Sequence, residues 1–339
     1  MKFLYFVSIV LTPIYYKYTT LYVRILIERS LKLAIKPPQL LPGDTIGIVT
    51  LGSPLEASVI NEGISTLEGL GFNVITGSSV YVDNGFLAGT PQERAADFMR
   101  MVENDAVKLI LPTRGGVGVA GILPYLNFSV IRSNPKLISG YSDITVLLNA
   151  IYEYADIITL HSLLLLDFNS NTPVYNYNQF FGATSERTVP WQIYNPLEMQ
   201  LISKVPGNVT GPIVGGNLTS FIGTLGTSFE VDTAGKILLL EETHEPINTV
   251  YRYLSNLRLA GKFTDCIGII MGECSNCAPA YGVTYDQLID EFLVPIGKPL
   301  MTNFATGHGT YKAAVPIGAT VNLNTENLTI TVMESTVSP

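Results

Sequence analysis

The sequence predicts an α/β protein with a mostly parallel sheet covered by helices, and two observations support this prediction. Short, wholly apolar runs, such as 45–51 (TIGIVTL) and 107–112 (VKLILP), are typical of strands that are buried on both faces. These runs alternate with segments of helical periodicity, as expected for parallel strands joined by crossover helices. With 339 residues, of which 47% are hydrophobic and 14% charged, the chain is long enough for two packed domains.

The first half of the chain supplies strands and helices in regular alternation. Pro37, Pro38 and Pro42 form a rigid approach to the first strand, and Thr90 with Glu93 has the spacing of a capping box at a helix start. The expected strands are 45–51, 72–75, 107–112, 136–138 and 157–160, and the expected helices are 57–70, the segment after Thr90, and 144–154.

The second half is predicted to begin with a connection and then to form a smaller α/β domain. Residues 166–210 are rich in Asn, Pro, Tyr, Thr and Ser and have weak periodicity, so we expect a connecting segment and an exposed wall there. Further strands are expected at 236–240 and 266–271, helices at 247–259 and 285–293, and a hairpin at 319–332. The predicted organisation is an extension at 1–36, a first domain at 37–165, the connection at 166–210 and a second domain at 211–339.

Residues 1–36 differ from the rest of the chain in charge. They contain six basic residues and one acid, whereas the remainder has 14 basic and 27 acidic residues, a net charge of −13. Because so acidic a body repels phosphate backbones, we expect no nucleic-acid partner. The apolar run at 3–16 is too short to span a membrane, since Pro13 and Lys17 interrupt it. The extension is interpreted as non-essential or as a membrane contact, which predicts a cytoplasmic protein or, alternatively, a membrane-associated one.

The sequence contains no convincing motif for a cofactor or a metal. The glycines at 115–118 match neither GxGxxG nor the P-loop. Cys274 and Cys277 have half of a zinc-site spacing but lack a second ligand pair, and three cysteines are too few for a disulfide scaffold. We therefore interpret these two cysteines as a structural thiol pair or a coincidence, and we expect neither cofactor nor metal.

Ser142 is the first candidate for chemistry. It lies between an expected strand and an expected helix, and functional groups gather at such strand ends in parallel sheets. A serine here can act as a nucleophile beside helix N–H groups that receive an oxyanion, or it can cap the helix. It is not in a G-x-S-x-G elbow, because the residue two after Ser142 is Ile144. The loop Arg114-Gly115-Gly116 follows another strand on the same edge, where it can hold an anion or form a plain turn.

Acids and histidines lie at further strand ends. Glu241 and Glu242 close an apolar strand, and two adjacent carboxylates there need a partner or a function unless they begin a helix. Because neighbouring side chains on a strand diverge, only one of the two can face inward. Among the three histidines, His308 lies between two glycines that leave it space to reach a partner. His161 follows a strand end near Ser142 and is expected to shape the pocket.

Taken together, these residues resemble the serine LD-carboxypeptidase family, which includes muramoyl-tetrapeptide carboxypeptidases and microcin C immunity relatives. The resemblance implies a Rossmann-like nucleophile domain and a C-terminal α/β domain that supplies Glu and His, with the active site in the cleft between them, commonly in a homodimer. It runs from residue 36 to the end, and its motifs are Thr113-Arg114-Gly115-Gly116, Asn134-Pro135-Lys136, Gly140-Tyr141-Ser142-Asp143-Ile144-Thr145, Gly215-Gly216-Asn217-Leu218, Leu240-Glu241-Glu242 and Gly307-His308-Gly309.

The resemblance also implies which residues do the chemistry. Carried over by motif, the catalytic triad falls on Ser142, Glu241 and His308. The implied oxyanion and substrate-binding positions are Arg114, Gly115, Gly116 and Asp143.

The implied reaction is hydrolysis of an L,D-peptide bond that releases terminal D-alanine from a peptidoglycan tetrapeptide. The family often has Tyr where Val117 stands and Gly where Ser162 stands, and these departures would alter substrate fit. One alternative is an amidase of the immunity type that cleaves a peptide- or aminoacyl-nucleotide, with Trp191 stacking on the base. Another is an inactive muropeptide-binding protein, against which the intact triad residue types argue.

Overall fold

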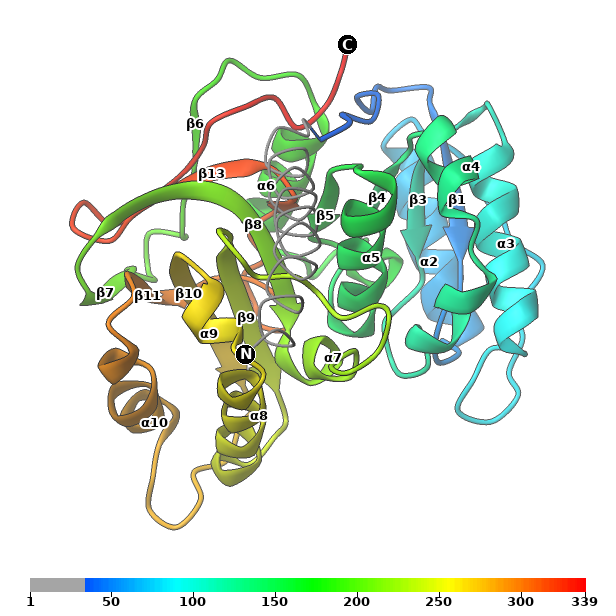
Figure 1. Ribbon diagram of the computed structural model, residues 1–339. Helices are drawn as coiled ribbons and strands as arrows, with labels where there is room; N and C mark the ends of the chain where they lie inside the picture. The colour runs from blue at the N-terminus through cyan, green and yellow to red at the C-terminus, as the bar shows by residue number, and fades with distance from the viewer. Residues whose placement is uncertain (1–33) are drawn as a thin grey trace, which may run out of the picture. The chain divides into compact units, whose positions relative to one another are not determined.

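The computed structural model describes residues 34–339, and residues 35–339 form one compact unit with two β-sheets (Figure 1). The first sheet has the strand order β12-β5-β4-β3-β1-β2. Strands β1 to β5 are parallel and β12 is antiparallel to β5, so the predicted α/β fold with a mostly parallel sheet is confirmed. The strands are β1 (Thr45–Val49), β2 (Asn73–Thr76), β3 (Val107–Pro112), β4 (Leu137–Gly140), β5 (Thr159–His161) and β12 (Val315–Ile317).

Three helices of the first sheet begin within one residue of their predicted starts, and the short helix at 128–133 was not predicted. The side chains of Thr90 and Glu93 form the predicted capping box, with Glu93 N–H donating to Thr90 Oγ1 at 3.2 Å and Thr90 N–H to Glu93 Oε2 at 2.8 Å. Apolar side chains of the helices at 91–103, 128–133 and 145–155 and of the central strands form one buried core, which includes Val49, Phe98 and Leu147. The helices are α2 (Ala57–Gly69), α3 (Pro91–Glu103), α4 (Phe128–Ser133) and α5 (Thr145–Ala155).

The second sheet has eight strands in the order β6-β14-β13-β8-β9-β10-β11-β7. Strands β8 to β11 are parallel, and the outer strands pair antiparallel, including the predicted hairpin of β13 and β14. The strands are β6 (Trp191–Ile193), β7 (Ile202–Val205), β8 (Asn208–Asn217), β9 (Ile237–Thr243), β10 (Gly268–Ser275), β11 (Leu300–Phe304), β13 (Thr320–Asn324) and β14 (Thr329–Val332).

Short helices complete this part of the fold, with α8 and α10 drawn below the second sheet in Figure 1. The α-helices here are α7 (Leu218–Ile222), α8 (Ile247–Leu259), α9 (Lys262–Asp265) and α10 (Tyr285–Phe292). The short 3₁₀ helices of the described chain are η1 (Ala120–Tyr125), η2 (Ser142–Ile144), η3 (Leu165–Asp167) and η4 (Val294–Ile296).

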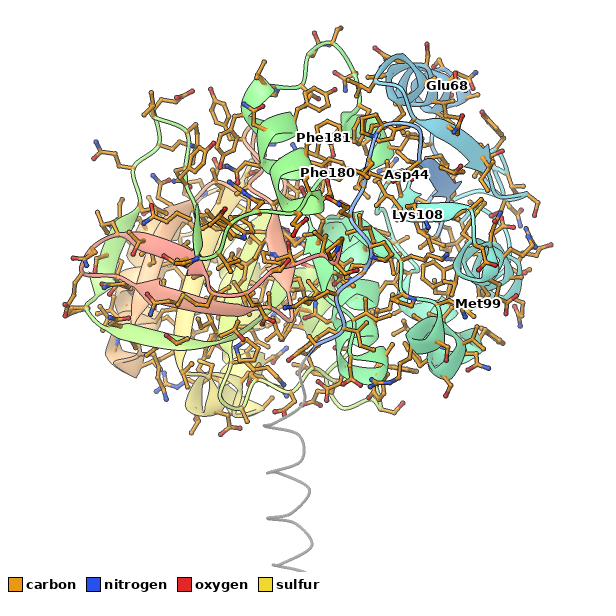
Figure 2. The ribbon with its side chains drawn as sticks, turned by 90° about the horizontal axis from the view of Figure 1, so that it is seen from above. Asp44, Glu68, Met99, Lys108, Phe180 and Phe181 are labelled. Carbon is orange, nitrogen blue, oxygen red and sulfur yellow. A yellow bond between two sulfur atoms is a disulfide. The ribbon has the colours of Figure 1, made fainter. Side chains whose placement is uncertain are left out.

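The segment 166–210 is more regular than predicted, because it contains α6 (Val174–Thr184) as well as β6 and β7. Phe180 on this helix is fully buried, and the next residue, Phe181, lies beside it on the same helix (Figure 2). The Phe181 ring stacks on Phe72 with centroids 6.0 Å apart. The helical period is masked because polar residues also face inward: Asn176 is buried and donates to Thr310 O at 3.0 Å. The segment therefore contains a helix and two strands that the sequence did not indicate, and its role as a connection stays a prediction.

Strand β12 joins the later part of the chain to the first sheet. Its residue Val315 pairs with His161 at the end of β5, and the sequence did not indicate this strand. The domain boundaries at 165 and 211 stay a prediction.

None of the helices in residues 34–339 is long and apolar enough to cross a membrane. Residues 1–33 of the extension lie outside the described part of the chain, so its interpretation as non-essential or as a membrane contact stays a prediction.

Candidate active site

Ser142 lies on a strained turn between a strand and a helix. β4 ends at Gly140, and Ser142 begins η2, which leads into α5. Ser142 has φ = 61°, in the left-handed region that non-glycine residues rarely adopt, and such a conformation costs roughly 1–3 kcal/mol. Neither η2 nor α5 has a side-chain hydrogen bond at its N-cap. The structure therefore overturns the interpretation of Ser142 as a helix cap.

The loop after β3 approaches Ser142 so closely that only glycine fits. A Cβ atom on Gly115 would lie 2.5 Å from Ser142 Cβ, 2.7 Å from Ser142 Oγ and 2.9 Å from Asp143 N. Gly116 has φ = 74°, and a Cβ atom there would lie 2.4 Å from the Ser53 side chain. Arg114 precedes these glycines, with Nη1 3.5 Å from Pro54 O. The structure thus brings the glycine loop and the Asp143 backbone together at the Ser142 hydroxyl.

The Asp143 carboxylate forms hydrogen bonds to two other segments of the chain. Asp143 Oδ2 accepts a hydrogen bond from Val119 N–H at 2.8 Å, and Oδ1 accepts one from the Ser220 hydroxyl at 3.1 Å. Burial raises the pKa of Asp143, although these hydrogen bonds and the charge of Arg94 act in the opposite direction. The side chain therefore ties the glycine loop after β3 to α7 of the second part of the chain.

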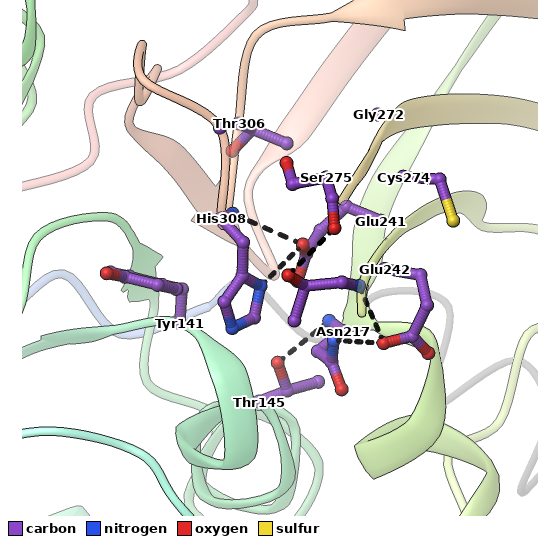
Figure 3. A network of polar contacts seen from close by, with 12 residues as sticks. Tyr141, Thr145, Asn217, Glu241, Glu242, Gly272, Cys274, Ser275, Thr306 and His308 are labelled. Carbon is purple, nitrogen blue, oxygen red and sulfur yellow. Dashed lines mark hydrogen bonds and ion pairs between the residues drawn. The ribbon is translucent and has the colours of Figure 1, made fainter. Parts of the chain in front are cut away.

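Glu241, near the end of β9, forms a hydrogen-bonded pair with His308 (Figure 3). Glu241 Oε2 accepts hydrogen bonds from His308 Nδ1 at 2.8 Å and from His308 N–H at 3.3 Å. The Glu241 side chain is fully buried, whereas that of His308 is 18% exposed. Burial by itself would raise the pKa of Glu241, but the hydrogen bond from His308 and the nearby His308 and His161 rings lower it below its ordinary value. Glu241 is therefore ionised at neutral pH.

Glu242 faces the other way and has different partners. Its Oε1 accepts from Asn217 Nδ2 at 3.1 Å and from Thr243 N–H at 2.8 Å, and its Oε2 accepts from Thr219 N–H at 2.9 Å. Thr219 is in the first turn of α7, so Glu242 satisfies a free N–H group of that helix. Burial raises the pKa of Glu242. The structure thus brings Glu241, and not Glu242, to His308.

Hydrogen bonds between α5 and β8 fix the two sheets relative to each other at the site. Asn149 on α5 donates to Gly215 O and accepts from Gly215 N–H, both at 2.9 Å. Thr145 Oγ1 accepts a hydrogen bond from Asn217 N–H at 2.9 Å (Figure 3). Because β8 pairs with β9, these bonds hold the helix that follows Ser142 against the strand beside Glu241.

Tyr141 links the Ser142 turn to His308. The edge of one ring meets the face of the other, with centroids 5.0 Å apart. The Tyr141 hydroxyl donates to Asp167 Oδ1 at 3.3 Å, and Lys312 Nζ lies 3.6 Å from the same oxygen. Burial raises the pKa of Tyr141 well above its ordinary value, so the phenol stays neutral. No feature of the sequence had indicated a role for Tyr141, Asp167 or Lys312.

Within residues 34–339, no hydrogen bond joins the Ser142 hydroxyl to His308. Contacts between a nucleophile and its base are often loose without substrate and tighten when it binds. Tyr141 is next to Ser142 in the chain and its ring contacts His308, so Ser142 and His308 lie in the same part of the site.

The remaining histidine, His244, and the cysteine pair lie in different surroundings. His244 is exposed, and its ring contacts Thr243 Oγ1 at 2.7 Å rather than His308. Cys274 and Cys277 form a disulfide, so their sulfurs are not available as a zinc ligand pair. The described residues contain no cluster of three His, Cys, Asp or Glu side chains that could hold a metal ion.

Trp191 does not offer an open stacking surface. Its side chain is 7% exposed, and the guanidinium of Arg187 lies over the ring, 4.4 Å from its centroid. The expectation that Trp191 could stack on a nucleotide base is therefore wrong for this structure, because the ring is buried on β6 and covered by Arg187.

The fold and the site define this protein as a peptidase, since its two halves match the two domains of one peptidase family. Residues 46–162 match the family model for the LD-carboxypeptidase N-terminal domain, and residues 210–323 match that for the LD-carboxypeptidase C-terminal domain. The chain belongs to the LD-carboxypeptidase family, and the resemblance inferred from the motifs is confirmed.

Individual relatives agree with this assignment. The Bacillus subtilis protein named "Probable murein peptide carboxypeptidase" is 36% identical over 311 residues, which cover 89% of this chain and 95% of the relative. The microcin C7 self-immunity protein MccF of Escherichia coli is 28% identical over 329 residues, covering 87% of this chain and 95% of MccF. A solved structure of MccF in complex with aspartyl sulfamoyl adenosine has a TM-score of 0.84 at 25% identity, covering 90% of this chain and all of that one.

Proposed function

We propose that the protein is a serine-type LD-carboxypeptidase that releases terminal D-alanine from a peptidoglycan tetrapeptide, as in murein recycling. In this proposal Ser142 is the nucleophile, His308 is the general base and acid, and Glu241 orients His308. The observation that supports it most is the 2.8 Å hydrogen bond from His308 Nδ1 to the buried Glu241 carboxylate. The second support is the approach of Gly115 to the strained Ser142 turn.

The protonation states follow from the geometry of the pair. Because Glu241 is ionised and accepts from Nδ1–H, the neutral His308 ring carries its proton on Nδ1 and leaves Nε2 free to accept one. His308 Nε2 then removes the Ser142 proton as the hydroxyl attacks the L,D-peptide carbonyl. The negative charge of Glu241 stabilises the imidazolium that forms.

The remaining steps use the glycine loop and the same imidazole. A backbone N–H of the Gly115-Gly116 pair and that of Asp143 bind the oxyanion, each donor contributing about 3–4 kcal/mol, and Arg114 helps to bind the substrate. The imidazolium of His308 protonates the amine of the leaving D-alanine, which breaks the peptide bond and leaves an acyl ester on Ser142. His308 then deprotonates a water, which hydrolyses the ester and regenerates the Ser142 hydroxyl.

A direct assay tests the proposal. Purified protein is incubated with a murein tetrapeptide, and free D-alanine is measured for wild type and for Ser142→Ala. Release by wild type only is the expected result. Release by both proteins would show that Ser142 is not the nucleophile. Release by neither would contradict the proposal that a murein tetrapeptide is the substrate.

The similarity to MccF supports a second candidate, an amidase that cleaves an aminoacyl-nucleotide. An aminoacyl-sulfamoyl adenosine in the same assay, with free amino acid as the readout, separates the two activities. The covered ring of Trp191 favours the tetrapeptide. We further propose that the protein is a cytoplasmic homodimer that acts on a small peptide and needs no cofactor. Sedimentation tests the oligomeric state, and cell fractionation tests the location.

A further inference from the structure

His161 is a histidine to which the proposed mechanism gives no role. It ends β5, is fully buried, and neither of its ring nitrogens has a hydrogen-bond partner within residues 34–339. A buried polar group without a partner costs free energy, so such groups in folded proteins call for a specific explanation.

The strands around His161 place it between the elements that carry the triad. It pairs with Gly140 on β4, two residues before Ser142. Its Nδ1 lies 3.0 Å from the point that a Cβ on Gly216 would occupy, and Gly216 is on β8, the strand paired with β9 of Glu241. His161 thus lies beside the strand that leads to Ser142 and close to the strand beside Glu241.

One carboxylate oxygen of Glu241 also lacks a hydrogen-bond partner within residues 34–339. Its Oε2 accepts both hydrogen bonds from His308, while its Oε1 is buried without a partner in the described chain. An ionised carboxylate oxygen that is buried and unpaired costs more than a neutral group in the same place. A second donor from the side opposite His308 would satisfy this oxygen.

His161 has the charge state that such a donor requires. Burial lowers the pKa of His161 to about 4, although the nearby Glu241 carboxylate acts in the opposite direction. A neutral imidazole has one N–H donor and one acceptor nitrogen. It can therefore donate to Glu241 without competing with the charge that develops on His308 during catalysis.

We propose that His161 is a positioning residue whose neutral ring donates to Glu241 Oε1, directly or through one ordered water, and so holds the carboxylate that orients His308. The inference rests on the proposed triad and deepens it. Glu241 would then lie between two imidazoles, one that reacts and one that only holds it in place.

Two substitutions at His161 test this role. His161→Leu removes the donor at similar size, and we expect kcat to fall about 10–100-fold with little change in KM. Losses of this size are typical when a residue that orients a metal-binding side chain is removed from a metalloenzyme. His161→Gln keeps an N–H donor and is expected to recover most of the loss. Thr159→Val is the matched control, because Thr159 is also buried on β5 but its hydroxyl donates to Leu148 O rather than to a triad residue. Wild-type kcat in His161→Leu, or no recovery in His161→Gln, would overturn the proposal.

A spectroscopic measurement decides the question even where His161→Leu does not fold. The chain has only three histidines, so the ¹⁵N resonances of the rings can be assigned by substitution. We expect the His161 ring to be neutral at neutral pH, and its ¹⁵N shifts to change in Glu241→Gln. Unchanged His161 shifts in that variant would refute the contact. Absence of D-alanine release by wild type would instead refute the proposed function, so the two failures are distinguishable.

Discussion

One oxygen of Glu241 accepts hydrogen bonds from both the ring and the backbone of His308, at 2.8 Å and 3.3 Å. The loop that carries His308 can come this close because Gly307 precedes the histidine. Gly307 has φ = 74°, and a Cβ atom there would lie 2.3 Å from the Glu241 carboxyl carbon. The carboxylate thus fixes the orientation of the ring and the path of the loop together.

The two acids at the end of β9 are predicted to differ sharply on substitution. Glu241→Gln keeps the shape but removes the negative charge that stabilises the imidazolium, so we expect kcat to fall by about 10²-fold or more. Glu242→Gln affects contacts with Asn217 and Thr219, and we expect nearly unchanged kcat with about 1–3 kcal/mol lower free energy of unfolding. Steady-state kinetics and urea unfolding of both variants measure this. If Glu242→Gln lost activity while Glu241→Gln kept it, the triad acid would be Glu242 and not Glu241.

Much of this arrangement could be predicted from short segments of sequence. The alternation of apolar strands and amphipathic helices gave the α/β fold, and the divergence of neighbouring strand residues required Glu241 and Glu242 to face apart. These signals are local, because each depends on residues within one element.

Contacts between distant segments could not be predicted in this way. Asn149 bonds to Gly215, 66 residues later, and only its polarity within an apolar helical run marked it. The helix α6 was missed because polar residues such as Asn176 occupy buried positions, where long-range hydrogen bonds satisfy them. The covering of Trp191 by Arg187 depends on a turn whose path the sequence does not reveal.

Ser142 and His308 are predicted to act as one unit. Ser142→Ala should lower kcat by about 10⁴-fold with the fold intact, and His308→Ala should cost a similar amount. The double variant should lose little more, because removing either group already abolishes the same step. Kinetics of the three variants, with circular dichroism as the control for folding, test this. Losses that add up in the double variant would contradict a joint role.

Metal chelators are predicted to leave the activity unchanged. The sulfurs of Cys274 and Cys277 are bonded to each other, and the proposed mechanism draws its base and its oxyanion donors from the chain itself. D-alanine release should therefore persist after treatment with EDTA or 1,10-phenanthroline followed by desalting. A loss of activity that added zinc restores would argue against the serine mechanism.

The approach of Gly115 to Ser142 gives the most local prediction. In Gly115→Ala the new methyl group would lie 2.5 Å from Ser142 Cβ, so the nucleophile turn or the loop must move. Because displacements of about 1 Å at a reacting group can cost about 10²-fold, we expect kcat to fall by that order. Gly121→Ala is the matched control, since its nearest neighbour outside the adjoining chain is Pro91 Cγ at 3.8 Å, an ordinary contact. We expect that variant to keep wild-type kcat. Equal activity of both variants would mean that the glycine loop does not lie against the reacting hydroxyl during catalysis.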